Sequence, residues 1–180
     1  MKKFEEKTIQ SEQIFSGRMI DLFVDQVELP NGEYSTREII RHPGAVAVIA
    51  ITDDHKLVMV EQYRKPLERS ILEIPAGKLD PGEDPADTAI RELEEETGYT
   101  TDKLTFITSF YTSPGFADEI LYLYLAEQLK VAKNGRETDD DEFVEVFEYG
   151  LDELVNFEAT QRIHDIKTSY AIQYLKLNNK

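Results

Sequence analysis

The sequence predicts an α/β (α+β) fold, with a mixed sheet flanked by helices and an N-terminal subdomain built on an antiparallel β hairpin. Three observations lead to this expectation. Runs rich in β-branched and aromatic residues occur before and after one strongly signalled central helix. An Asn-Gly dipeptide separates two further runs of this kind near the N-terminus. Near the C-terminus, apolar residues return at helical spacing.

The N-terminal subdomain is expected to cover residues 1–43, with strands 19–29 and 34–40 joined by a two-residue turn at Asn31-Gly32. The first of these strands carries apolar residues on both faces. A peripheral hairpin that is apolar on both sides needs two covering surfaces. One could be its own core and the other a second subunit, so we expect a homodimer. The alternative is that the hairpin extends the core of a monomer.

The main domain is expected to cover residues 44–180 and to contain most of the strands. Residues 45–51 and 57–63 predict a β hairpin around a polar turn, and residues 71–75 a short strand. Residues 104–111 and 119–126 predict two strands around the turn Ser113-Pro114-Gly115. Residues 130–141 are polar and predict a surface loop, and residues 142–149 alternate apolar and acidic side chains as a strand does.

The central helix is expected over residues 85–97. Asp84 is an N-cap residue followed by proline at the first helical position, and Gly98 supplies the left-handed residue that commonly ends a helix. An apolar stripe should face the core, with Glu92 and Glu96 along its border; its members are Ala86, Ile90, Leu93 and Thr97. A second helix should pack through a face containing Ile163, Ile166, Tyr170, Tyr174 and Leu177.

The two glutamates four residues apart suggest a cation site. Like charges at this spacing destabilise an isolated helix by a few tenths of a kcal/mol, so a positive charge should lie between Glu92 and Glu96. Magnesium fits because it takes oxygen ligands and binds through a few carboxylates, substrate phosphates and water. The simpler alternative is a solvated acidic helix.

Composition sets the class of protein. With 180 residues, 41% of them hydrophobic, the chain can bury one good core. It has no cysteine, no secretory signal and no run long enough to span a bilayer, so cytoplasm is the default location. A formal charge of -16 argues against nucleic acid as a partner. It also implies that an anionic substrate would need divalent cations to cancel charge.

A motif around the central helix carries a family resemblance. Between Gly77 and Tyr99 the chain reads Gly-x5-Glu-x7-Arg-Glu-Leu-x-Glu-Glu-x-Gly-Tyr. At about one in fifteen per position, a match at seven of these positions would arise by chance in roughly one chain in a million. The seven are Gly77, Glu83, Arg91, Glu92, Glu95, Glu96 and Gly98. The pattern resembles the Nudix box, the metal-binding loop-helix-loop of hydrolases that cut nucleoside diphosphates linked to another group. The resemblance implies that residues 44–180 are a Nudix hydrolase domain with a sandwich fold.

Three features outside the box resemble the ADP-ribose pyrophosphatase branch. Pro114 lies sixteen residues after Gly98, as the downstream proline marker of that branch does. The segments Glu61-Gln62-Tyr63-Arg64 and Glu73-Ile74-Pro75-Ala76-Gly77 are also similar to it. Together they make ADP-ribose the leading substrate and imply a dimer whose N-terminal segment helps to build the partner's site.

The resemblance also implies metal ligands. Glu92 and Glu96 would bind two or three Mg²⁺ or Mn²⁺ ions together with the backbone carbonyl of Ala76. Glu95 would be a ligand or an orienting group. Arg91 would orient the glutamates, and Glu83 would hold the loop or a more distant ion.

Substrate contacts are expected from both parts of the chain. Arg64 would contact the diphosphate through its planar fork, and Glu119 would contact the ribose end near the Pro114 turn. Arg37 would reach the partner's substrate. Tyr34 would stack on adenine, although packing in the core or on the surface explains that residue equally well.

A carboxylate must take a proton from the attacking water. The branch takes such an acid from the loop before the sixth strand, so Glu142 is the first choice as base and metal ligand, and Asp140 is the alternative. The expected products are AMP and ribose 5-phosphate. Two other functions stay open: hydrolysis of another nucleoside diphosphate sugar such as GDP-mannose, and a noncatalytic module that senses nucleotides.

Overall fold

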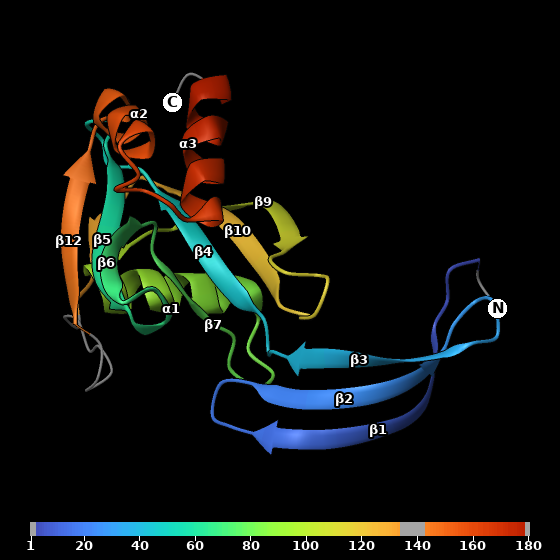
Figure 1. Cartoon of the computed structure of the whole chain (residues 1–180). Helices are drawn as coiled ribbons and strands as arrows, with labels where there is room; N and C mark the ends of the chain where they lie inside the picture. The colour runs from blue at the N-terminus through green and yellow to red at the C-terminus, as the bar shows by residue number, and fades with distance from the viewer. Residues whose placement is uncertain (1–2, 134–142, 179–180) are drawn as a thin grey trace. The chain divides into compact units, whose positions relative to one another are not determined.

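The computed structural model describes residues 3–133 and 143–178 and divides into two compact units (Figure 1). Unit 1 consists of Met1–Ala45 and Ser109–Leu121. Unit 2 consists of Val46–Thr108 and Tyr122–Lys180. The predicted fold class is confirmed, because the chain combines helices, a layered set of sheets and a separate antiparallel N-terminal sheet.

Unit 1 contains a three-stranded antiparallel sheet in the order β1-β2-β3, with β1 Lys7–Ser16, β2 Asp21–Glu28 and β3 Tyr34–Arg41. The predicted hairpin is confirmed as β2 and β3, but its loop has three residues rather than two. Leu29 and Glu33 still pair, with 2.7 Å from the nitrogen of Leu29 to the oxygen of Glu33. Gly32 lies in the loop between these two residues and has a φ of 85°, a conformation that suits glycine. The edge strand β1 is a strand that the sequence pattern did not reveal.

Unit 2 holds most of two main sheets and a small two-stranded one, in the orders β7-β4-β10-β9, β12-β5-β6 and β11-β8. The strands of the first sheet are β4 Ala45–Ala50, β7 Ala76–Lys78, β9 Lys103–Tyr111 and β10 Ile120–Glu127. Those of the second are β5 Leu57–Arg64, β6 Arg69–Glu73 and β12 Val144–Tyr149, with the short helix η1 Lys65–Leu67 after β5. The small sheet joins β8 Tyr99–Thr100 to β11 Lys130–Val131.

The expected hairpin between β4 and β5 was wrong. These consecutive strands belong to different sheets and are joined by an isolated bridge between Ile51 and Leu57. The physical reason is burial: residues 46–50 and 57–60 are buried without alternation, so each strand needs cover on both faces. A tight turn, closed by the nitrogen of Thr52 donating to the oxygen of Lys56 at 2.9 Å, therefore leads from one sheet into the other.

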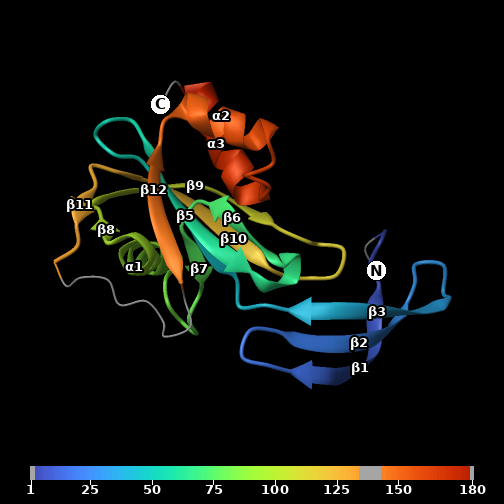
Figure 2. The same ribbon diagram turned by 60° about the vertical axis from the view of Figure 1, so that its left-hand side comes forward.

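In the described parts of the chain, three α-helices cover the sheets: α1 Pro85–Thr97, α2 Leu151–Ala159 and α3 Ile166–Asn178. Figures 1 and 2 show α1 on one side of the strands of unit 2, and α2 and α3 on the other. The bounds predicted for α1 are confirmed. The Asp84 carboxylate accepts from the nitrogen of Ala86 at 2.8 Å, and Gly98 ends the helix at φ 73°. Helix α2 was not predicted.

The buried faces of two helices differ from the predicted ones. On α1, the glutamates Glu92 and Glu96 are buried together with Ala89 and Leu93, whereas Ile90 is only half-buried. The acidic pair therefore lies within the buried face rather than at its border. Such burial requires hydrogen-bond partners for both carboxylates.

On α3, the buried residues are Lys167, Thr168, Ala171, Ile172 and Leu175. The expected face was wrong, since Ile166 and Leu177 are 67% and 83% exposed. Lys167 and Thr168 belong to the buried face because both have polar partners inside the fold.

The core cluster nearest the acidic pair joins α1 to both main sheets. Ala89 and Leu93 of α1 pack with Val46 and Val48 of β4 and Val58 of β5. This packing fixes the position of α1 relative to the sheets of unit 2. Among the described residues, no helix is both long and apolar enough to cross a membrane.

Candidate active site

Arg91 is the centre of the candidate site. Its Nε and Nη2 donate to the two oxygens of Glu83 at 3.1 and 3.0 Å. Its Nη1 donates to Glu92 Oε1 at 2.7 Å and to Glu95 Oε2 at 2.8 Å, and Nη2 also reaches the carbonyl of Lys78 at 3.2 Å. One guanidinium thus brings together three of the predicted glutamates and ties the loop before α1 to the helix.

The charged groups of this cluster shift one another's pKa values. The hydrogen bond to Glu83 is the main cause that raises the pKa of Arg91; burial opposes it, and the charge of Glu92 adds to it. The same hydrogen bond holds the pKa of the Glu83 carboxyl below its usual value. Because one cation contacts three carboxylates, the cluster keeps an excess of negative charge that favours a bound cation.

Glu96 is held from the other side. It is 2% exposed, and its Oε2 accepts from the backbone nitrogen of Ala76 at 2.9 Å. Gln62 of β5 donates to its Oε1 at 3.3 Å. The segment that was expected to supply the Ala76 carbonyl therefore lies beside Glu96, and ligation by that carbonyl stays a prediction.

Gly77 makes room for Glu92. A Cβ built on Gly77 would overlap the carboxyl group of Glu92, so no residue with a side chain fits at this position without moving that glutamate. The requirement for glycine at the start of the motif is therefore steric.

The side chains fit a hard divalent cation. Glu92 and Glu96 are 9% and 2% exposed and offer only oxygen atoms. Among the described residues, no three His, Cys, Asp or Glu side chains form a metal-binding group. Two carboxylates completed by backbone, water and phosphate oxygens form the kind of incomplete set that magnesium uses.

Arg64, expected at the diphosphate, lies at the end of β5, two residues from Gln62. Its Nε and Nη2 donate to Glu73 at 2.6 and 3.0 Å. Burial by itself lowers the pKa of Arg64, but the hydrogen bonds and charge of Glu73, with smaller contributions from Glu96 and Asp165, leave this pKa raised. The Glu96 contribution shows that Arg64 is within electrostatic reach of the candidate cation site.

Four predicted substrate contacts lie in unit 1. Arg37 donates to both oxygens of Glu6, at 2.8 and 2.6 Å, and Tyr34 is 65% exposed. Glu119 accepts from Thr112 within the segment 109–121.

Pro114 occupies a turn in which the nitrogen of Ala117 donates to the oxygen of Ser113 at 2.9 Å. Glu142 and Asp140, the two candidates for the base, lie outside the described residues. The roles of all six residues stay predictions.

Sequence reasoning missed three residues that contact members of the site or their partners. Gln62 and Glu73 both lie inside segments noted only for their resemblance. Glu73 carried a local signal, because it is an acid within the apolar run 71–74. Lys167, which pairs with Glu73, had no local signal, since the two are 94 residues apart.

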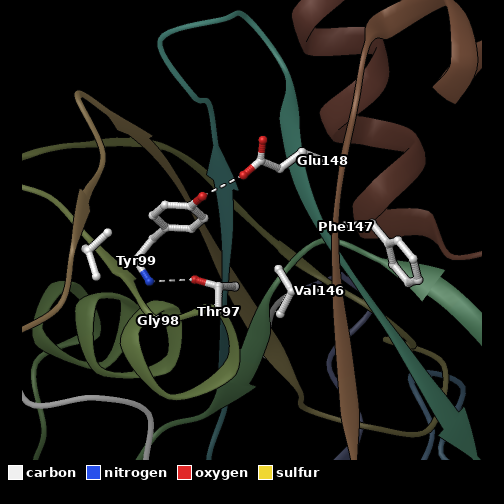
Figure 3. A pocket seen from close by; sticks show the side chains of 7 residues that line it. Thr97, Gly98, Tyr99, Val146, Phe147 and Glu148 are labelled. Atoms are coloured by element: carbon white, nitrogen blue, oxygen red, sulfur yellow. Dashed lines mark hydrogen bonds between the residues drawn. The ribbon is translucent and has the colours of Figure 1, made fainter.

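A cavity of about 560 Å³ opens at the C-terminal end of α1, between β8, β11 and β12 (Figure 3). The Tyr99 hydroxyl donates to Glu148 at 2.5 Å, and the nitrogen of Tyr99 donates to Thr97 Oγ1 at 3.1 Å. None of the predicted site residues that the structure describes is among the residues that line this cavity.

Comparisons with known families agree with this geometry. The family model "NUDIX domain" matches residues 41–170. A second model, "Nucleoside diphosphate sugar hydrolase N-terminal domain", matches residues 6–40.

Two bacterial relatives cover nearly the whole chain. An ADP-ribose pyrophosphatase of Bacillus subtilis is 63% identical over 98% of this chain and 96% of its own length. A methanol dehydrogenase activator of Bacillus methanolicus is 62% identical over 98% of this chain and 95% of its own length. A crystal structure of an ADP compounds hydrolase matches the fold with a TM-score of 0.83 at 22% identity, over 97% of this chain and 96% of that one.

We predict that Gly77→Ala weakens metal binding by about tenfold, because the new methyl group displaces the Glu92 carboxylate. Binding of Mn²⁺, followed by electron paramagnetic resonance, measures the change. Gly115→Ala is the matched control, since a Cβ at that position meets no atom within 4 Å. Equal Mn²⁺ affinity of Gly77→Ala and wild type would contradict the steric role of Gly77.

Proposed function

The chain belongs to the Nudix family, and from this premise we propose that it hydrolyses ADP-ribose to AMP and ribose 5-phosphate, with Mg²⁺ or Mn²⁺. The observation that carries the proposal is the 63% identity, over nearly the full length of both chains, to an ADP-ribose pyrophosphatase. The intact glutamate cluster around Arg91 supports a catalytic rather than a sensing role.

The ligands proposed for the metal are the carboxylates of Glu92 and Glu96, the Ala76 carbonyl and, as ligand or orienting group, Glu95. A bound divalent ion, one of two or three, would neutralise phosphate charge and lower the pKa of the attacking water. Arg91 keeps Glu92 and Glu95 in fixed orientations through its Nη1 contacts.

Substrate binding is proposed to begin with Arg64. Its Nε–Nη2 edge is engaged by Glu73, which leaves the Nη1–Nη2 edge for a diphosphate oxygen pair. Glu119 next to the Pro114 turn is proposed for the ribose end. Arg37 is proposed to reach the partner's substrate, and Tyr34, whose ring is exposed, to stack on adenine.

Proton removal from water is proposed for Glu142, with Asp140 as the alternative. A carboxylate in this position can take the proton while water attacks one phosphorus of the diphosphate. Negative charge then passes to the leaving phosphate, which the bound metal ions would stabilise.

We expect ADP-ribose to be cleaved only with Mg²⁺ or Mn²⁺, because the excess negative charge of the site repels the substrate without a cation. Hydrolysis in oxygen-18 water, followed by mass spectrometry, reports the substrate and the phosphorus attacked. GDP-mannose and ADP-glucose serve as competing substrates, and EDTA as the metal control. Unchanged turnover in EDTA, or faster cleavage of GDP-mannose, would contradict the proposal.

Two charge-removing variants separate metal binding from proton transfer. Glu96→Gln should weaken Mn²⁺ binding and lower kcat about a hundredfold with the fold retained, because it removes a ligand and charge repulsion together. Glu142→Gln should lower kcat by a similar factor and flatten the acidic limb of the pH profile. If Glu96→Gln lost its thermal unfolding transition, Glu96 would have a structural role. If Glu142→Gln kept the wild-type kcat, Glu142 would not be the base.

A second candidate function follows from the 62% identity to a methanol dehydrogenase activator. An activating action on methanol dehydrogenase would use the same fold. The Glu96→Gln variant tests whether it would also use the same site: activation by wild type but not by the variant assigns the effect to the hydrolase site.

We also propose a cytoplasmic homodimer formed through unit 1. Strand β1 lies at the edge of its sheet, and every residue in it is exposed. Phe4 and Met19, which flank it, are 79% and 63% exposed. An exposed edge strand that also carries Ile9, Ile14 and Phe15, at 48%, 52% and 55% exposure, favours pairing with a second copy.

Light scattering at micromolar concentration should therefore give the mass of two chains. Ile14→Glu, which places a charge on the 52% exposed Ile14 of β1, should shift the mass toward one chain. Val131→Glu, at an 80% exposed position in unit 2, is the control and should leave the mass unchanged. A mass of one chain for the wild type would exclude the dimer.

A further inference from the structure

Four charged side chains meet where α3 begins. Lys167 at the start of α3 contacts Glu73 of β6, and its Nζ lies 3.0 Å from Asp165 Oδ2. Glu73 also receives the fork of Arg64. The side chains of Glu73, Lys167 and Asp165 are 2%, 10% and 16% exposed, whereas that of Arg64 is 38% exposed. Arg64 is therefore the member of the group with the greatest access to solvent.

The start of α3 is fixed against the strand region by hydrogen bonds. Asp165 accepts from the backbone nitrogen and the hydroxyl of Thr168, at 3.0 and 2.5 Å. The Thr168 hydroxyl in turn accepts from the backbone nitrogen of Ile74 at 2.9 Å. Asp165 is thus the N-cap of α3, and the cap places Lys167 next to Glu73.

The charges in this group balance, with two cations and two carboxylates. Lys167 supplies a second positive charge to Glu73, so Arg64 need not neutralise that carboxylate alone. Buried ion pairs are weak evidence for stability, because apolar residues of similar volume often serve as well. Of these four side chains, Arg64 is the most exposed to solvent and is also the one on which the charge of Glu96 acts, so a role toward a bound ligand would pass through Arg64.

We propose that Lys167 is a positioning residue that orients Arg64 and keeps its charge available for the substrate diphosphate. By holding Glu73 in place, Lys167 fixes the plane of the Arg64 guanidinium and directs its Nη1–Nη2 edge outward. By balancing Glu73, it leaves the charge of Arg64 for an external anion. This inference rests on the diphosphate-binding role of Arg64 in the proposed function.

Steady-state kinetics on ADP-ribose test the inference. Lys167→Met keeps most of the length of the stem and removes the charge, and should raise KM about tenfold with kcat within about threefold. Lys167→Gln keeps a hydrogen-bond donor near Glu73 and should change KM in the same direction, so it serves if Lys167→Met unfolds. Lys176→Met is the matched control, because Lys176 lies on the same helix and pairs with Glu158 instead.

A double-mutant cycle with Arg64→Ala separates positioning from general destabilisation. If Lys167 acts through Arg64, Lys167→Met should have little effect on KM in the Arg64→Ala background. A folded Lys167 variant with wild-type KM, or an undiminished effect without Arg64, would overturn the inference alone. Wild-type KM in Arg64→Ala would instead contradict the proposed role of Arg64, and no ADP-ribose hydrolysis by wild type would contradict the proposed function; either result removes this inference as well.

Discussion

A single guanidinium holds together the acidic cluster of unit 2. Arg91 contacts Glu83, Glu92 and Glu95 at once, and so joins the loop at residues 78–83 to α1. Gly77 adds a steric condition, because only a residue without a side chain leaves room for Glu92. The result is a buried acidic surface whose charge one arginine cannot cancel. A cation completes it better than any further side chain would, because a cation can bind substrate oxygens at the same time.

The sequence correctly predicted the structural features that depend on residues close together in the chain. Asp84, Pro85 and Gly98 fixed both ends of α1, and the Asn31-Gly32 dipeptide located the hairpin of β2 and β3. Predictions that required distant partners were less successful. Nothing within residues 45–63 shows that β4 and β5 enter different sheets, because that choice depends on what covers each strand.

The same distinction holds for the site. The residues around Arg91 fall within one continuous motif, so their spacing identified them before their contacts were known. The contact of Gln62 with Glu96 spans 34 residues, and that of Lys167 with Glu73 spans 94. The apolar periodicity also predicted the wrong buried face for α3, because Lys167, which pairs with Glu73, is buried there. The roles of unit 1 residues and of Glu142 depend on arrangements that sequence and geometry within each unit leave as predictions.

The long connection between β6 and α3 has a consequence for how the chain folds. Glu73 is synthesised 94 residues before Lys167, so a nascent chain holds this carboxylate in a growing sheet before its second cation exists. Closing so long a loop costs entropy that local contacts do not return, which places docking of α3 late in the folding reaction. Until that step the Glu73 carboxylate would have Arg64 as its cation without Lys167, so we expect Arg64 to reach its final orientation only when α3 docks.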